Sequence, residues 1–300
     1  TDPPFRFLCK KFGVDVVYTE FISSEGLIRN AEKSVKKLQI SDTERPIGIQ
    51  IFGYNIESMK LAAKIAEEQN PDMIDINCGC PVKKVVSKGC GSALLKDIKK
   101  LQTMVAEVVK SVNIPITVKT RLGWDTDTII IDELVERLQD VGVQAITIHA
   151  RTRSQMYSGE SDWSHIGRVK NNPRIQIPII GNGDIDSAEK AIDYKNRWGV
   201  DGIMIGRATI GHPWIFDEIK AKIENKAYEK PNIEEIILQH LEMERDYKNE
   251  HYAVVSLRKH YKNYFKNIHD VKSLKIQLME AETINEVKAI FDMYKKNNCI

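Results

Sequence analysis

Cys80 stands in a short segment whose side chains are suited to proton transfer. The segment Asp75-Ile76-Asn77-Cys78-Gly79-Cys80-Pro81 follows a strand-like run, and a Gly-rich turn with Lys88-Gly89-Cys90-Gly91 comes after it. A thiol has a reference pKa of about 8.5, so near neutral pH it is mostly protonated. At the carboxyl end of a strand it can donate a proton, attack as a thiolate or bind a metal, and its neighbours decide which.

The spacing of the cysteines argues against a metal site and against a disulfide framework. Cys78, Cys80 and Cys90 lack the paired spacing of structural zinc sites, and no histidine lies near them in the sequence. With Cys9 and Cys299 the chain has five cysteines, an odd number that is typical of reduced thiols in a chain of ordinary size. We therefore expect no metal, and we expect Cys78 and Cys90 to be packing residues.

A repeated pattern organises the first 230 residues: a short β-branched run, a turn, then a longer amphipathic stretch. This pattern predicts strands at Val14–Thr19, Pro46–Phe52, Met73–Asn77, Ile116–Thr120, Ala145–His149, Ile177–Gly181 and Gly202–Gly206. It predicts helices near Glu25–Gln39, Ile56–Gln69, Ser92–Val112, Thr128–Val141, Ser187–Arg197 and Trp214–Lys226. Alternation of this kind indicates an α/β protein with a parallel sheet covered by helices.

The number of strands bears on whether the sheet is closed or open. The chain starts with Thr1-Asp2-Pro3-Pro4-Phe5-Arg6-Phe7-Leu8-Cys9, which is typical of a capped helix, so the eighth strand of a (β/α)8 TIM barrel would precede it. An open, doubly wound sheet is the alternative, but no G-x-G-x-x-G follows any predicted strand. We therefore predict a barrel whose first strand is absent from this chain.

Polar residues occur at the carboxyl end of every predicted strand. In order, they are Glu20, Gln50, Asn77 with Cys80, Lys119 with Arg121, His149 with Arg151, Asn182 with Asp184, and Gly206 with Arg207. Core-facing strand residues are normally apolar, so polar groups gathered at one rim are hard to attribute to packing. Because barrel enzymes carry their chemistry at this rim, these residues are the candidate site.

Four motifs along the chain resemble those of the tRNA-dihydrouridine synthases, most closely the bacterial B-type branch. They are Asn77-x-Gly79-Cys80-Pro81, Val118-Lys119-x-Arg121-Leu122-Gly123, the run His149-Ala150-Arg151-Thr152-Arg153 with Gln155-x-Tyr157-x-Gly159-x-x-Asp162-Trp163, and Gly181-Asn182-Gly183-Asp184-Ile185 with Gly206-Arg207-Ala208. The resemblance implies an enzyme that reduces uridine in tRNA, with FMN as cofactor and NADPH, or NADH, as reductant. The family opens with a strand ending in Pro-Met-Ala that lies against the flavin, and this sequence begins just after it.

The resemblance also implies roles for individual residues. Cys80 would be the acid that protonates the uracil ring opposite the flavin. Lys119 would meet the electron-rich edge of the reduced flavin, and Arg121, two residues on, would meet the uracil carbonyls. Residues expected to bind the flavin ring or its phosphate are Gln50, Asn77, Lys119, His149, Asn182, Gly183, Asp184, Gly206 and Arg207.

The sequence changes character after Lys230-Pro231. From Ile233 to Asn297 it shows helical periodicity without proline or glycine, which predicts a small all-α bundle. We therefore expect an FMN-binding barrel domain at 1–230 and a helical tRNA-binding domain at 231–300. The residues expected to contact RNA phosphates are the basic helical face of Arg258, Lys259, Lys262 and Lys266, continued by Arg151 and Arg153.

Composition limits the remaining function classes. The 300 residues carry a net charge of only +2, so a nucleic-acid partner requires a local basic patch. No apolar run approaches the ~18 residues of a membrane span, and no signal peptide opens the chain, so we expect a cytoplasmic monomer. Two alternatives stay open: a flavin dehydrogenase acting on a free pyrimidine or other small molecule, and a non-catalytic RNA-binding protein.

Overall fold

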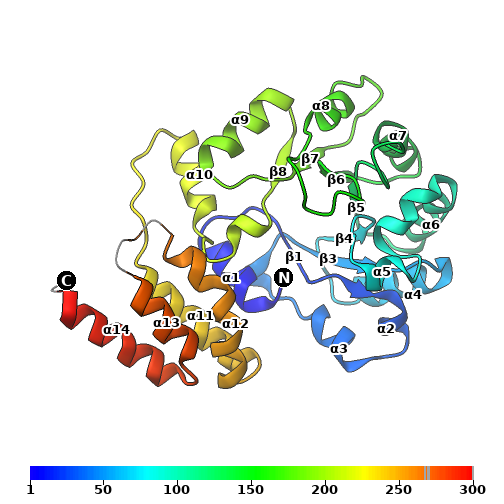
Figure 1. Cartoon of the computed structure of the whole chain (residues 1–300). Coiled ribbons are helices and arrows are strands. Elements are labelled where there is room, and N and C mark those ends of the chain that lie inside the picture. The colour runs from blue at the N-terminus through cyan, green and yellow to red at the C-terminus, as the bar shows by residue number, and fades with distance from the viewer. Residues whose placement is uncertain (267, 269–270, 299–300) are drawn as a thin grey trace. The chain divides into compact units, whose positions relative to one another are not determined.

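A computed structural model describes residues 1–266, 268 and 271–298, so Cys299 lies outside the described residues (Figure 1). This part of the chain divides into two compact units. The first comprises residues 1–2 and 15–206, and the second comprises 3–14 and 207–300.

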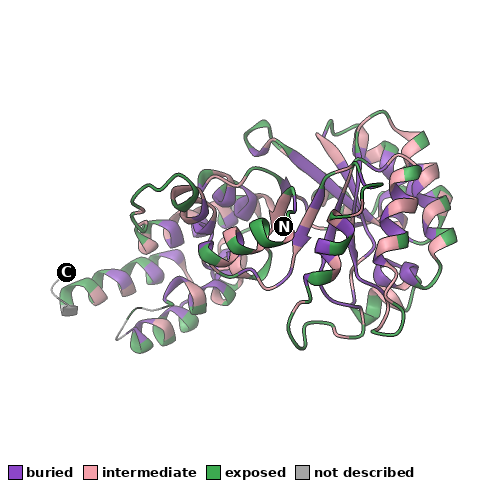
Figure 2. Ribbon diagram, turned by 90° about the horizontal axis from the view of Figure 1, so that it is seen from above, coloured by how far each residue is buried: buried purple, intermediate pink, exposed green. Residues whose placement is uncertain are grey.

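Across the described residues, eight strands of the first unit form one parallel sheet in the order β1-β3-β4-β5-β6-β7-β8, with β2 paired to β3. The strands are β1 Val17–Tyr18, β2 Ile22–Ser23, β3 Ile47–Phe52, β4 Met73–Asn77, β5 Ile116–Arg121, β6 Ala145–His149, β7 Ile179–Asn182 and β8 Gly202–Met204. Figure 2 shows the central strands mostly buried. The sheet and its helices form a curled (β/α) barrel architecture, as the alternating pattern predicts.

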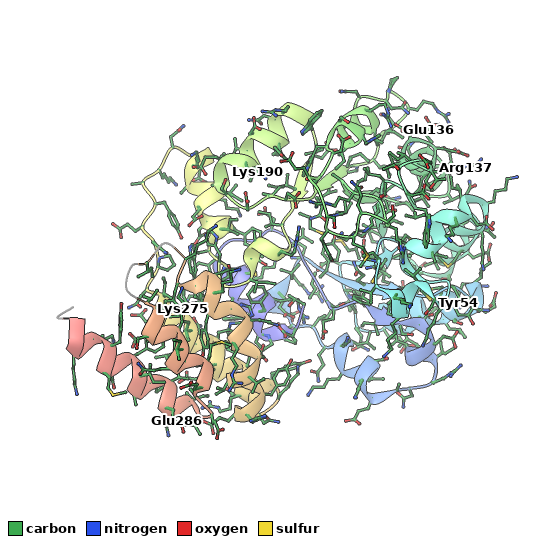
Figure 3. All side chains as sticks on the ribbon, in the orientation of Figure 1. Tyr54, Glu136, Arg137, Lys190, Lys275 and Glu286 are labelled. Carbon is green, nitrogen blue, oxygen red and sulfur yellow. The ribbon has the colours of Figure 1, made fainter. Side chains whose placement is uncertain are left out.

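Helices connect successive strands and cover the outside of the sheet. They are α2 Ser24–Ile28, α3 Glu32–Val35, α4 Ile56–Glu67, α5 Lys83–Val86, α6 Ile98–Ser111, α7 Ile131–Asp140, α8 Ser164–Lys170 and α9 Ala188–Trp198, with 3₁₀ turns η1 Lys36–Leu38, η2 Asp42–Glu44 and η3 Gly91–Lys96. Neighbouring helices pack in chain order, α4 on α6, α6 on α7 and α7 on α8. Their outer faces are charged, and Glu136 and Arg137 on α7 form ion pairs with Arg174 and Glu133 (Figure 3).

The second unit is entirely helical, as predicted from the loss of strand signal. It contains α1 Pro3–Lys11, η4 Arg207–Thr209, α10 Ile215–Ile223, α11 Ile233–Tyr247, α12 Glu250–Tyr264, α13 Lys272–Glu280 and α14 Ile284–Asn298. Its apolar core joins Phe5 and Leu8 of α1 and Trp214 to residues of α11–α14.

The structure differs from the sequence predictions at several elements. The strand expected at Val14–Thr19 is limited to β1 Val17–Tyr18, and β2 Ile22–Ser23 was not predicted. The helix expected at Glu25–Gln39 is broken into α2, α3 and η1 because Asn30 takes a left-handed conformation with φ 52°. The seven-residue α8 was not among the predicted helices, since two buried apolar residues are too few to show a period. The units divide after Gly206 rather than near residue 230, because Trp214 and α1 bury their apolar side chains in the helical core.

Candidate active site

Strand register brings the predicted polar residues together at one edge of the sheet. Asn77 is paired with Lys119, Arg121 with His149, and His149 with Asn182. Alternate residues of a strand share a face, so Asp75 and Asn77 of β4 point to the same side of the sheet. Candidates from five adjacent strands, β3 to β7, therefore form a continuous polar surface at the carboxyl edge.

The first part of this surface is a buried hydrogen-bond network around Gln50. Its amide nitrogen donates to Asp75 Oδ2 at 2.6 Å, and its amide oxygen accepts from Asn77 Nδ2 at 2.9 Å. Thr117 donates to the other oxygen of Asp75 at 2.6 Å. Burial raises the pKa of Asp75 to about 6 against the opposing effect of these hydrogen bonds and of Lys119. The network fixes the orientation of the Asn77 side chain.

Asn77 in turn positions the segment that carries Cys80. Its Oδ1 accepts from the backbone N–H groups of Gly79 at 3.2 Å and Cys80 at 2.9 Å. Ser92 donates to the Cys80 carbonyl through both its hydroxyl, at 2.9 Å, and its backbone N–H, at 3.1 Å. The backbone of Cys80 is therefore held from both sides.

Cys80 is the described cysteine that reaches the surface. Cys9, Cys78 and Cys90 are buried, whereas Cys80 is half-buried, and all four are free thiols. Burial, with the charge of Asp75, raises the pKa of Cys78, and burial also raises that of Cys90. The packing role expected for Cys78 and Cys90 is confirmed, and Cys80 is the thiol available for chemistry.

Lys119, His149 and Asn182 form the second part of the polar surface. Asn182 Oδ1 accepts from Lys119 Nζ at 3.3 Å and lies 2.7 Å from His149 Nδ1, while Asn182 Nδ2 donates to the Met204 carbonyl at 2.7 Å. This pattern places the imidazole hydrogen on Nδ1 and leaves Nε2 as an acceptor. Nε2 is buried and has no hydrogen-bond partner among the described residues.

Burial sets the protonation of the two basic groups in this cluster. Desolvation, with the charges of Lys119 and Arg121, lowers the pKa of His149 to about 3, so the ring is neutral. Desolvation lowers the pKa of Lys119 to about 8. The negative charge of Asp75 opposes this lowering, and a negative charge on Cys80 would also raise the Lys119 pKa. The site therefore combines one neutral acceptor, one readily titrated ammonium and one accessible thiol.

Arg121 was expected to meet the substrate, which stays a prediction, and the structure shows that its side chain also connects two loops. Its buried guanidinium donates to three backbone carbonyls, those of Gly79 at 2.9 Å and of Thr152 and Met156 at 2.8 Å. These bonds join the segment of Cys80 to the loop after β6. The strand position of Arg121 was predictable, but its acceptors belong to loops whose conformation was not.

Arg151 and Asp184 are likewise occupied with each other. The Arg151 side chain is 2% exposed, and its two terminal nitrogens contact the two carboxylate oxygens of Asp184. Arg151 also donates to the Ser158 and Gly159 carbonyls. This pair joins the loop after β6 to the loop after β7, and the ligand contacts expected of Arg151 and Asp184 stay predictions.

The family of the chain is decided by a comparison over nearly its whole length. A family model described as "Dihydrouridine synthase (Dus)" matches residues 1–298. The chain belongs to the dihydrouridine synthase family. It is accordingly an oxidoreductase, and the family indicates a flavin cofactor.

Two relatives illustrate the match to dihydrouridine synthases. A "Probable tRNA-dihydrouridine synthase 1" of Synechocystis is 37% identical over 297 residues, covering 97% of this chain and 82% of the relative. A "tRNA-dihydrouridine synthase B" of Pasteurella multocida is 41% identical over 249 residues, covering 81% of this chain and 74% of the relative. Names of the second kind recur among the relatives, which confirms the resemblance to the B-type branch.

Solved structures share the fold at low sequence identity. Histamine dehydrogenase from Rhizobium sp. 4-9 matches with a TM-score of 0.54 and 15% identity, over 80% of this chain and 46% of that chain. A 6-hydroxypseudooxynicotine amine oxidase from Pseudomonas geniculata matches with a TM-score of 0.57 and 14% identity, over 74% of this chain and 44% of that chain.

The remaining predicted site residues of this dihydrouridine synthase family member are Gly183, Gly206 and Arg207. Gly183 has a φ of 137° and its carbonyl accepts from Trp163 Nε1 at 3.0 Å. Gly206 is exposed, and a side chain there would meet nothing within 4 Å. Arg207 begins the longer segment of the helical unit, residues 207–300. A phosphate at these residues stays a prediction.

One residue of the basic face of the helical unit makes a hydrogen bond within that unit. Arg258 is half-buried and donates from Nη2 to the Ala281 carbonyl at 3.1 Å, at the end of α13. Lys259, Lys262 and Lys266 are exposed. Phosphate contacts are therefore better sought at the three lysines than at Arg258.

Some site features escaped the sequence analysis. Asp75 and Thr117 complete the Gln50 network, and their place two residues before Asn77 and Lys119 on each strand was the available signal. The Arg121 guanidinium carbon lies 5.5 Å from the centre of the Tyr157 ring, and this ring packs edge-on against His149. Both contacts depend on the conformation of the loop after β6.

Two negative findings hold for the described part of the chain. Among its residues, no group of three or more His, Cys, Asp or Glu side chains is placed to hold a metal ion. None of its helices is both long and apolar enough to span a membrane.

Proposed function

We propose that this chain is a tRNA-dihydrouridine synthase that reduces the C5–C6 double bond of a uridine, using FMN and NADPH, with Cys80 as the proton donor. One observation carries the proposal: Cys80, whose backbone N–H donates to Asn77 Oδ1, has a half-buried free thiol at a polar strand edge that also contains Lys119 and the unpartnered buried Nε2 of His149. Such a surface is equipped for a ligand with both donor and acceptor groups.

The residues present fit a flavin. A neutral His149 Nε2 without a partner can accept from a hydroxyl or imide N–H, and the Lys119 ammonium, with one hydrogen bond at 3.3 Å, can meet an electron-rich ring edge. Gln50, Asn77, Lys119 and His149 would hold the ring. The phosphate is expected at Asn182, Gly183, Gly206 and Arg207, and a Cβ at Gly206 would meet no atom within 4 Å.

In the proposed reaction a bound reduced flavin supplies a hydride to one carbon of the uracil double bond. Cys80 gives its thiol proton to the other carbon, so the ring gains two hydrogens and the thiolate remains. The Lys119 ammonium, which lies on the strand next to that of Asn77, would stabilise that thiolate. Asn77 keeps the Cys80 backbone in place through the reaction.

The uridine and its RNA define the partners. We propose that the first unit binds FMN and the turned-out uridine, and that Lys259, Lys262 and Lys266 of the helical unit contact tRNA phosphates. The protein would act as a cytoplasmic monomer with NADPH, or NADH, as its reductant.

The test is an activity assay with two substrates. Purified protein supplied with FMN and NADPH is incubated with unmodified tRNA or with free uridine, and dihydrouridine is measured by mass spectrometry of the nucleosides. We expect dihydrouridine in the tRNA and not from free uridine. Reduction of free uridine at an equal rate would support the small-molecule dehydrogenase, and no flavin retention with tRNA binding intact would support a non-catalytic RNA-binding protein.

A further inference from the structure

Trp124 gathers two cationic side chains in the loop after β5. Lys96 Nζ, at the end of η3, lies 3.7 Å from the centre of a Trp124 ring, and the Arg153 guanidinium carbon lies 4.5 Å from one. The three residues come from loops after three successive strands, β4, β5 and β6. Because those strands are parallel, the loops lie at the carboxyl edge of the sheet together with Cys80.

Backbone hydrogen bonds join the loops that carry Trp124 and Arg153. Arg153 donates its backbone N–H to the Gly123 carbonyl at 2.9 Å, and Ser154 donates to the Trp124 carbonyl at 2.8 Å. A side chain at Gly123 would lie 2.0 Å from the Thr128 carbonyl oxygen, so the backbone fits tightly there. The backbone that carries Trp124 is therefore held in place by its neighbouring loops.

The two cations lack an anionic partner. Among the described residues, neither Lys96 nor Arg153 forms an ion pair, and Arg153 Nε is buried without a hydrogen-bond partner. Asp97, next to Lys96, accepts from the backbone of Lys100 at the start of α6. Asp125 in the neighbouring turn is bonded to Thr128 at 2.7 Å.

Two positive charges against one indole favour an anion. Each cationic group lies against a Trp124 ring, and a phosphate with several acceptor oxygens can accept hydrogen bonds from more than one donor. A guanidinium or ammonium over an aromatic face is stabilised by the ring and keeps N–H groups free at its outer edge. The trio is thus suited to bind a phosphate.

The site is joined to the segment of Cys80. Ser92, in the same 3₁₀ turn as Lys96, holds the Cys80 carbonyl, and Arg121 links the Gly79 carbonyl to that of Thr152, next to Arg153. Lys83, Lys84 and Lys88 in the loop after Cys80 are exposed. A uridine at Cys80 remains covalently attached to phosphodiesters on both sides, and its strand must leave across these loops.

We propose that Lys96, Trp124 and Arg153 bind one phosphodiester of the tRNA strand beside the uridine that is reduced. The inference rests on the proposed function and adds a binding site within the barrel unit, separate from the lysines of the helical unit. Trp124 acts by positioning the two cations, which make the contacts with the phosphate oxygens.

The test compares Lys96→Ala, Arg153→Ala and their double variant with Lys64→Ala, an exposed lysine near the end of α4. Equilibrium binding of tRNA is measured over a range of salt concentrations. We expect the double variant to bind about tenfold more weakly and to lose about 0.7–0.9 from the salt slope, as for one phosphate contact, while Lys64→Ala matches the wild type. Trp124→Phe should restore most of the affinity that Trp124→Leu loses, since it keeps an aromatic face.

Different outcomes separate this inference from the proposed function. Wild-type affinity and salt slope in the double variant would overturn the phosphate site, whether or not the wild type makes dihydrouridine. A raised KM for NADPH with unchanged tRNA affinity would also overturn it, because the anion would then belong to the reductant. Failure of the wild-type protein to make dihydrouridine would refute the proposed function alone, since binding is measured independently.

Discussion

Replacing Asp184 by Ala should destabilise the barrel unit strongly, because it leaves the Arg151 guanidinium buried without its anion. Arg151 is 2% exposed and both its terminal nitrogens contact the Asp184 carboxylate. Its two other acceptors are backbone carbonyls, which carry no net charge. The charge therefore has no substitute partner among these contacts once the carboxylate is removed.

The size of the effect follows from the cost of an uncompensated buried charge. Breaking a buried pair by removing one partner costs about 3–5 kcal/mol. In a unit of this size each kcal/mol lowers the melting temperature by about 2–4 °C, so Asp184→Ala should melt roughly 6–20 °C lower. Asp184→Asn, which keeps an acceptor, should lose less. The double variant Arg151→Met/Asp184→Leu should recover much of the loss, because no charge is left buried.

The dependence on pH supplies a second readout for the same pair. Burial opposes ionisation of Asp184, but the hydrogen bonds and charge of Arg151 prevail and hold its pKa below the ordinary value. A lowered carboxyl pKa stabilises the fold above about pH 4 and is lost as the pH falls through the folded-state value. The melting temperatures of wild type and Asp184→Ala should therefore differ at pH 7 and approach each other below about pH 4.

Thermal unfolding followed by circular dichroism at pH 7 and in acid measures both effects. A wild-type melting temperature for Asp184→Ala at pH 7 would refute the reasoning and show that the ion pair contributes no more than an exposed one.

Three further predictions concern the ligands. Lys119→Ala and Arg207→Ala should each reduce FMN retained after dialysis, and unchanged stoichiometry in both would argue against their placement. Burial lowers the pKa of Lys119 to about 8, so its charge is present below that pH; FMN affinity should fall as the pH rises through about 8 in the wild type, and fluorescence titration should find this dependence absent from Lys119→Ala. The triple variant Lys259→Ala/Lys262→Ala/Lys266→Ala should bind tRNA more weakly with a flatter salt dependence, whereas Lys272→Ala on α13 should not; equal binding isotherms for the triple variant and the wild type would make this face ordinary surface.

Most of the strands could be predicted from the sequence, because their periodicity is a local property, but the two-residue β2 Ile22–Ser23 could not. Met73–Asn77 and Ala145–His149 have the expected bounds in β4 and β6. Parallel strands bring their carboxyl ends to one edge, which is why Asn77, Lys119 and His149 were expected together before their contacts were known.

The roles of the arginines could not be predicted in the same way. The sequence places Arg121 and Arg151 near strand ends, but their partners are carbonyls and a carboxylate supplied by distant loops. A basic residue at the rim is equally compatible with a ligand contact and with a brace. The same limit explains why Trp124 drew no attention, since its cation contacts depend on three loops.

The division between the units was also hidden. Helical periodicity assigned Trp214–Lys226 to the barrel by analogy with the helices before it. In the structure Trp214 and Ile215 are buried within the second unit, and the core that takes up Trp214 also contains α1, more than 200 residues earlier. Packing between residues so far apart in the sequence produces no pattern in the residues around either of them.

The most direct test of the account is whether the Cys80 thiol is needed when tRNA oxidises the reduced flavin. Flavin is reduced anaerobically with NADPH in wild type, Cys80→Ala and the matched control Cys90→Ala, and its absorbance is followed after tRNA is added. We expect wild type and Cys90→Ala to reoxidise with formation of dihydrouridine, and Cys80→Ala to retain flavin but reoxidise at least about a hundredfold more slowly. Reoxidation of Cys80→Ala at the wild-type rate, with an equal yield of dihydrouridine, would contradict the assignment of Cys80 as the proton donor.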